Sequence, residues 1–120
     1  MVEAAARDQS LLLDMLLAAQ DAHVFVAGLD AAQFSGSRLH QHAVIRCLEI
    51  IGEAAGRVSP QFQAAHPEIP WRKVIGMRHR LIHGYSEVDI DIVWSVLRDE
   101  LLPLIAKLAP LIPPEDAPAA

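Results

Sequence analysis

The feature that most constrains the fold is an apolar segment with helical periodicity between Arg7 and Gly28. Its apolar side chains cover most of the circumference of the predicted helix; they are Leu11, Leu12, Leu13, Met15, Leu16 and Leu17. A helix that is apolar nearly all round is buried on more than one side. We therefore expect this helix to contact both the core of its own chain and a second subunit.

Helical periodicity extends over much of the remaining chain, and the sequence shows no clear strand or hairpin pattern. A chain of 120 residues, of which 52% are hydrophobic, is large enough to build one core. We predict an all-α fold, an antiparallel bundle of four main helices plus a short helical turn. The helical domain spans residues 1–109, and a proline-rich tail over residues 110–120 is expected to be flexible.

Capping and helix-breaking residues set the expected boundaries in the first half of the chain. Residues 30–37 are typical of a loop, and a second helix is expected from residue 37 or 38 to residue 58. Ser59 and Pro60 then suit the cap and the first position of the short helical turn.

Similar signals set the expected boundaries in the second half. A third helix is expected from Pro70 to about His83, because proline is favoured in the first turn of a helix. A fourth is expected from about Glu87 to Leu108. Ser86 and Asp89 resemble a capping box at its start. Pro103 should kink this helix or end its regular part.

Cysteine content and the distribution of apolar residues indicate a cellular location. Cys47 is the only cysteine, so the chain cannot form an intramolecular disulfide, which fits a reducing cytoplasm. Residues 1–8 do not resemble a signal peptide, and the run from Leu11 to Ala19 is too short to cross a bilayer. We expect a soluble, cytoplasmic protein that has no membrane contact.

Charge is distributed unevenly along the chain. The net charge of −5 argues mildly against nucleic-acid binding, which requires Lys and Arg for phosphate contacts. The segment 71–83 nevertheless contains several basic residues and no acid; they are Arg72, Lys73, Arg78 and Arg80. This segment is therefore the expected place for an anionic ligand.

The second helix carries one line of polar residues on an apolar body. Its members recur every three or four positions and so share one face of the helix; they are His42, Arg46, Glu49, Glu53 and Arg57. The line is either an ordinary solvated face or the wall of a cleft that meets the basic third helix. Periodicity does not decide between these two interpretations.

The segment that contains Arg78, His83 and Tyr85 is the expected centre of chemistry. An Arg, a His and a Tyr together can bind a phosphate, move a proton and offer a hydroxyl. On a regular helix Arg78 and His83 would lie about 140° apart. They could converge if His83 lies in a loosened last turn before Gly84, or if two copies of the segment meet across a dimer.

Metal-independent cleavage of RNA is the reaction that these side chains suit. His83 could deprotonate a ribose 2′-hydroxyl or protonate the leaving 5′-oxygen, because histidine titrates near neutral pH. Arg78 could stabilise the negative charge on phosphorus through bidentate hydrogen bonds. The attack would leave a 2′,3′-cyclic phosphate, and it needs RNA because DNA lacks the 2′-hydroxyl.

Two other interpretations of this segment stay open. Basic residues followed by glycine are also typical of an ordinary helix end, where the helix dipole favours positive charge. His79 and His83 are four residues apart and could share a metal, but Arg80 stands where a zinc-protease motif has Glu. We expect no metal and no cofactor.

The Arg-x4-His-x-Tyr pattern at Arg78, His83 and Tyr85 resembles the HEPN superfamily, and specifically its HepT-like toxin branch. Further segments are similar to that branch; they are residues 48–55, 66–71, 75–78 and 88–94. The resemblance covers about residues 8–108. It implies a HEPN-like helical bundle that forms a homodimer, with the two motifs facing a shared cleft.

The resemblance also implies a function and a means of control. It implies a ribonuclease toxin encoded beside an MntA-like nucleotidyltransferase antitoxin, which can transfer AMP to the motif tyrosine, here Tyr85. AMP on Tyr85 would add bulk and negative charge beside Arg78 and His83, and would therefore block an RNA phosphate.

One residue departs from the pattern of that branch. His79 stands where Asn is common, so it could compete with His83 as the proton carrier. Glu53 and Arg46 are the other residues that we expect to face the cleft. An alternative function is a catalytically inactive dimer that serves as a nucleotide-binding or regulatory partner of a nucleotidyltransferase, which the acidic net charge favours slightly.

Overall fold

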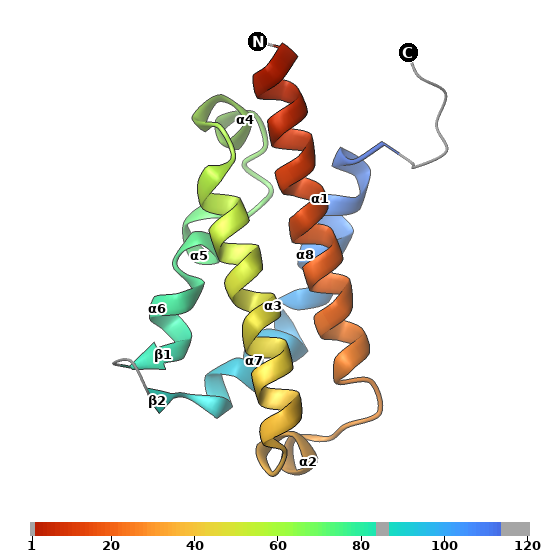
Figure 1. Ribbon diagram of the computed structural model, residues 1–120, viewed down its shortest axis with the longest axis vertical. Helices are drawn as coiled ribbons and strands as arrows, with labels where there is room; N and C mark the ends of the chain where they lie inside the picture. Colours follow the sequence, from red (N-terminus) through yellow and green to blue (C-terminus); the bar gives the residue numbers. More distant parts are fainter. Residues whose placement is uncertain (1, 84–86, 114–120) are drawn as a thin grey trace.

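Two long helices form the centre of the molecule. The computed structural model describes residues 2–83 and 87–113. Helix α1 (Val2–Phe25) and helix α3 (Arg38–Arg57) lie side by side along the long axis, with α8 against α1 and with α5 and α6 against α3 (Figure 1). Apart from one pair of two-residue strands, the regular structure in these residues is helical, so the predicted all-α fold is confirmed.

Helix α1 buries one of its sides and exposes another. Leu12, Met15 and Leu16 lie in the core, whereas Leu13 is 41% exposed and Leu17 is 50% exposed. The single chain therefore buries one side of this helix, and burial of a second side against another subunit stays a prediction. The exposed apolar side is free to contact another molecule.

The segment predicted as a loop between the two long helices contains a further helix, α2 (Ala31–Ser35). The Asp30 carboxylate accepts from the Gln33 amide N–H, and the Gln33 side chain accepts from the Asp30 amide N–H, which together form a capping box. Phe34 is fully buried, with its ring centroid 5.3 Å from that of Trp94. The loop prediction is wrong, because Asp30 and Gln33 cap the start of a short helix and Phe34 anchors it in the core.

The predicted boundaries of the second helix and of the helical turn are confirmed. Helix α3 begins after Ser37, whose side chain accepts from the His40 amide N–H. Helix α4 (Pro60–Ala65) begins after Ser59, with Pro60 at its first position. The buried carboxylate of Asp8 on α1 accepts from the Ser59 amide at 2.9 Å and from its hydroxyl at 2.6 Å, so α1 is tied to the start of α4.

The predicted continuous helix from Pro70 to His83 is wrong. The chain instead forms helix α5 (Trp71–Ile75), helix α6 (Met77–Leu81) and strand β1 (Ile82–His83). Strand β1 pairs antiparallel with β2 (Glu87–Val88), with Ile82 opposite Val88, so the expectation of no strand is also wrong. The pairing draws Ile82 into an extended conformation at φ −117° and ψ 121°, and this ends the helix.

The predicted fourth helix is divided and starts later than expected. Helix α7 (Ile90–Asp99) begins after Asp89, whose carboxylate accepts from the Ile92 amide N–H, so Asp89 is itself the cap. Ser86, the expected partner of Asp89 in a capping box, lies outside the described residues, as does Gly84. Helix α8 (Leu101–Leu108) follows a break at Glu100.

The break at Glu100 confirms the predicted effect of Pro103. Proline has no amide N–H to donate to the carbonyl of Asp99, and its ring crowds that carbonyl.

A 3₁₀ turn, η1 (Ala109–Leu111), follows α8, and Leu111 and Ile112 pack against the core. The remainder of the predicted tail, residues 114–120, lies outside the described residues. None of the described helices is long and apolar enough to cross a membrane.

Candidate active site

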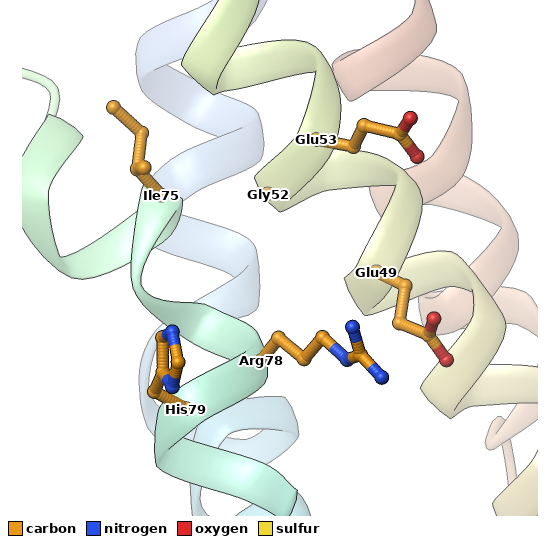
Figure 2. A pocket seen from close by; sticks show the side chains of 6 residues that line it. All are labelled: Glu49, Gly52, Glu53, Ile75, Arg78 and His79. Atoms are coloured by element: carbon orange, nitrogen blue, oxygen red, sulfur yellow. The ribbon is translucent and has the colours of Figure 1, made fainter.

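A cavity of about 400 Å³ lies between α3 and the α5–α6 segment. Its lining residues come from both sides: Glu49, Gly52 and Glu53 from α3, Ile75 from α5, and Arg78 and His79 from α6. Figure 2 shows Arg78 extending from α6 toward α3, where Glu49 and Glu53 project, while Ile75 and His79 lie on the α5–α6 side. The cavity thus places cationic and carboxylate side chains in one small space.

The helical period of α3 explains one wall of this cavity. Glu49 and Glu53 are four residues apart and therefore lie on the same face of the helix. This part of the polar line forms a cleft wall, as the second interpretation of the line predicts. Arg46 is exposed and is not among the residues that line the cavity, whereas Glu53 is.

A glycine on α3 explains why α5, which contributes to the other wall of the cavity, lies so close to α3. Gly52 is buried, and a Cβ atom built on it would lie 3.0 Å from the carbonyl oxygen of Val74 on α5. Few real Cβ atoms approach a neighbouring atom so closely, so the Val74 backbone would have to move by a few tenths of an ångström. The absence of a side chain at Gly52 therefore allows the backbone of α5 to pack directly on α3.

The two α6 residues of the cavity are available to a ligand. Arg78 and His79 are both exposed. Among the residues that the structure describes, Arg78 forms no ion pair within 4.0 Å, although two carboxylates share its cavity. A guanidinium in this setting can form bidentate hydrogen bonds with a phosphate group.

Only part of the predicted catalytic segment can be placed. The backbone of His83 lies in β1, where His83 pairs with Glu87, and Tyr85 lies outside the described residues. Because helix α6 ends at Leu81, the 140° separation expected on a regular helix does not apply to Arg78 and His83. The helix does end before Gly84, as the loosened-terminus interpretation requires.

The same break removes the geometric basis of a metal site at His79 and His83. Those residues share a helix face only if one regular helix contains both, and His83 lies in a strand. Within residues 2–83 and 87–113, no group of three or more His, Cys, Asp or Glu side chains is arranged to hold a metal ion.

An ion pair on the other side of α6 was not apparent from the sequence. The Arg80 guanidinium donates to both carboxylate oxygens of Glu100, at 3.0 Å and 2.7 Å, and Lys73 Nζ lies 3.5 Å from one of these oxygens. The hydrogen bonds from Arg80 hold the pKa of Glu100 below its ordinary value, and they raise the pKa of Arg80. Twenty residues separate the partners, so helical spacing gives no sign of the contact.

Comparison with known proteins relates this chain to a protein family. A family model described as Ribonuclease HepT-like matches residues 15–111. Two proteins of Methanocaldococcus jannaschii, both named as candidate RNases, are similar to 93 residues of this chain, or 78% of it. One is 33% identical, with 85% of its own length covered, and the other is 36% identical, with 80% covered. A protein of Thermococcus cleftensis, named a probable ribonuclease HepT, is 45% identical over 71 residues, which are 59% of this chain and 64% of that protein. No solved structure matches the chain.

Proposed function

The chain belongs to the ribonuclease HepT-like family, and from this membership we propose that it is a toxin that cleaves RNA and is neutralised by a nucleotidyltransferase antitoxin. Family membership assigns ribonuclease activity to the protein. The observation that supports a specific mechanism is the cavity between α3 and α6, in which Arg78 is exposed and free of any described ion pair. The carboxyl end of α6 leads from this cavity directly to His83.

The proposed reaction is an intramolecular transesterification of RNA. A histidine, which we assign as His83, removes the proton of a ribose 2′-hydroxyl, and the 2′-oxygen attacks the adjacent phosphorus. The bond to the 5′-oxygen breaks, and that oxygen takes up a proton. The products are a 2′,3′-cyclic phosphate and a 5′-hydroxyl. His79 shares the cavity with Arg78 and is a second group that can carry a proton.

Arg78 stabilises the charge that develops on phosphorus in this reaction. Its planar guanidinium can donate two parallel hydrogen bonds to phosphate oxygens as the negative charge on them grows. Glu49 and Glu53 cannot bind a phosphate, because carboxylates repel it, so we assign them a supporting role. Their negative charges attract the Arg78 guanidinium across the cavity, although no ion pair forms within 4.0 Å in the described residues.

Tyr85 is the proposed point of control. Transfer of AMP from ATP would form a phosphodiester bond to the tyrosine oxygen and release pyrophosphate. The added phosphate carries a negative charge, and Tyr85 lies two residues after His83 in the sequence. An RNA phosphate would then meet both steric obstruction and like-charge repulsion at the site. We propose a cytoplasmic location, because RNA and ATP are both available there.

Expression with and without the partner tests this proposal. The chain expressed alone should stop growth, and co-expression with a nucleotidyltransferase encoded beside it should restore growth. Intact-mass measurement of the co-expressed chain should show added AMP, and Tyr85→Phe should lose both the added mass and the rescue. No toxicity and no AMP, together with binding of ATP or of the partner, would instead support the regulatory alternative.

A further inference from the structure

Helix α6 carries Arg78 and His79, but it is too short to be stable without contacts to the rest of the protein. It has five residues, and neither of its ends is capped by a side chain. A single helical turn is unstable in isolation, because few hydrogen bonds compensate for the ordering of its backbone. Its orientation therefore depends on tertiary contacts. Buried Met77 and Leu81 provide the apolar part of these contacts.

The most specific polar contact of α6 is made by Arg80. Its two terminal nitrogens bond separately to the two carboxylate oxygens of Glu100, the residue at which the chain breaks between α7 and α8. The side chains of Arg80 and Glu100 are 28% and 29% exposed, so the pair is largely shielded from solvent. A paired, planar contact of this kind restricts the direction of approach as well as the distance.

This contact lies on the side of α6 opposite to Arg78. Two residues along an α-helix correspond to a rotation of about 200°, so Arg78 and Arg80 project in nearly opposite directions. The contact between Arg80 and Glu100 therefore restrains rotation of α6 about its own axis. In the restrained orientation, Arg78 points into the cavity. A small rotation of α6 would turn Arg78 away from α3.

We propose that Arg80 and Glu100 are positioning residues of the ribonuclease, acting on RNA only through the orientation of Arg78 and His79. The inference rests on the proposed function of that cavity. A competing interpretation is that Arg80 binds RNA phosphates directly. The structure argues against it, because both terminal nitrogens of Arg80 already donate to the carboxylate of Glu100.

Substitutions at each partner distinguish the two interpretations. Arg80→Gln, Glu100→Gln and the double variant are compared on a pool of fluorescently labelled, random-sequence single-stranded RNA. We expect each single variant to lower the single-turnover cleavage rate on the order of 10-fold to 100-fold. The half-saturating protein concentration should change little. The double variant should be no slower than Glu100→Gln, because that single variant already removes the contact with Arg80 together with the ion pair to Lys73 at 3.5 Å.

Two further variants separate positioning from a general loss of structure. Arg80→Lys keeps the charge but not the paired geometry, so it should recover part of the rate. Asp99→Asn is the matched control, because Asp99 forms a similar paired contact with Arg98 at an exposed site beside Glu100, and it should cleave at the normal rate. Amide hydrogen exchange over residues 78–82 should accelerate in Arg80→Gln and Glu100→Gln but not in Asp99→Asn.

The results that would overturn the inference are specific. If Glu100→Gln keeps the normal rate and binds RNA more tightly with a steeper salt dependence, Arg80 is a direct RNA contact. If the unsubstituted protein cleaves nothing in the pool, the proposed function fails, and the exchange measurement still tests the contact. Unchanged exchange over residues 78–82 in both single variants would overturn the positioning role.

Discussion

At the scale of single residues, Arg78 carries the largest share of the proposed chemistry. It is exposed, it lines the cavity with two glutamates, and it belongs to the short helix that leads to His83. Removing one donor that stabilises developing charge typically slows a reaction about 10²-fold to 10³-fold. Arg78→Ala should therefore reduce RNA cleavage by about this factor, measured under single-turnover conditions.

Two variants make the Arg78 test specific. Arg78→Lys keeps the positive charge but cannot form a bidentate contact, so it should remain well below the rate of the unsubstituted protein. Arg72→Ala removes an exposed cation from the neighbouring helix α5, and should change the rate far less. Equal losses in Arg78→Ala and Arg72→Ala would mean that the basic segment acts only through its total charge.

Glu100 gives the protein a defined dependence of stability on pH. Its folded-state pKa is below the ordinary value of 4.5, chiefly because of the hydrogen bonds from Arg80. A lowered pKa means that the pair stabilises the fold fully above about pH 4.5, and that this contribution disappears as pH falls through the folded-state pKa.

The comparison with Glu100→Gln isolates this contribution. At neutral pH the variant should have a lower free energy of unfolding, by about 1 kcal/mol. The difference should shrink toward zero in acid, because the unsubstituted Glu100 then becomes neutral as well. Urea unfolding across a pH series measures both quantities. A difference that stays constant into acid would contradict an electrostatic origin.

At the scale of elements, the cavity depends on the close approach of α3 and α5 at Gly52. Alanine there would place Cβ 3.0 Å from the Val74 carbonyl oxygen, so the backbone of α5 would have to move away by a few tenths of an ångström. Gly56, on the same helix, has only Ile75 Cγ2 near it, at 3.8 Å, an ordinary contact distance. The two glycines therefore form a matched pair for one substitution.

Alanine should have opposite effects at these two positions. Gly52→Ala should lower the free energy of unfolding by about 1 kcal/mol, because overpacking outweighs the gain in helix propensity. Gly56→Ala should raise it by about 0.5 kcal/mol, because only the propensity gain applies. Chemical denaturation measures both changes. Stabilisation by Gly52→Ala would show that α5 can shift without cost.

Local signals predicted some elements of this molecule and not others. The limits of α3 followed from Ser37 at one end and Ser59-Pro60 at the other, because caps and proline act within one turn. The end of α6 did not follow, because Ile82 becomes extended only through pairing with Val88. The contact between Arg80 and Glu100 was equally hidden, since it depends on how α6 meets the α7–α8 junction.

The sequence likewise predicted some residues of the candidate site and not others. Of the two residues of the polar line that we expect to face the cleft, Glu53 lines the cavity and Arg46 does not. Glu49 belongs to the same line and also lines the cavity. A helical period identifies a face, and only the position of α6 determines which turns of that face it covers.

At the scale of the whole molecule, the exposed side of α1 supports the expectation of a homodimer. Leu13, Leu17 and Val24 recur at helical spacing, lie on one face, and are 41%, 50% and 66% exposed. A face of this kind, on a helix whose other side is in the core, suits a second copy of the chain. We predict that the protein sediments with twice the mass of one chain.

A charged substitution on this face tests the predicted interface. Leu17→Arg should shift the protein toward the monomer in analytical ultracentrifugation, because it buries an unpaired charge in the contact. Leu39→Arg is the control, because Leu39 is 76% exposed on α3, outside the α1 face. Equal weakening by both substitutions, or by neither, would place the interface elsewhere.

The central claim is that the protein cleaves RNA by its own side chains through attack of the 2′-hydroxyl. The most direct measurement is the chemistry of the product ends, after cleavage of labelled RNA by the purified protein in the presence of EDTA. The account predicts a 2′,3′-cyclic phosphate and a 5′-hydroxyl, no cut at a 2′-deoxy linkage, and loss of cleavage in His83→Ala with the fold and dimer intact. Cleavage that requires a divalent metal and leaves a 5′-phosphate, or that persists in His83→Ala, would contradict it.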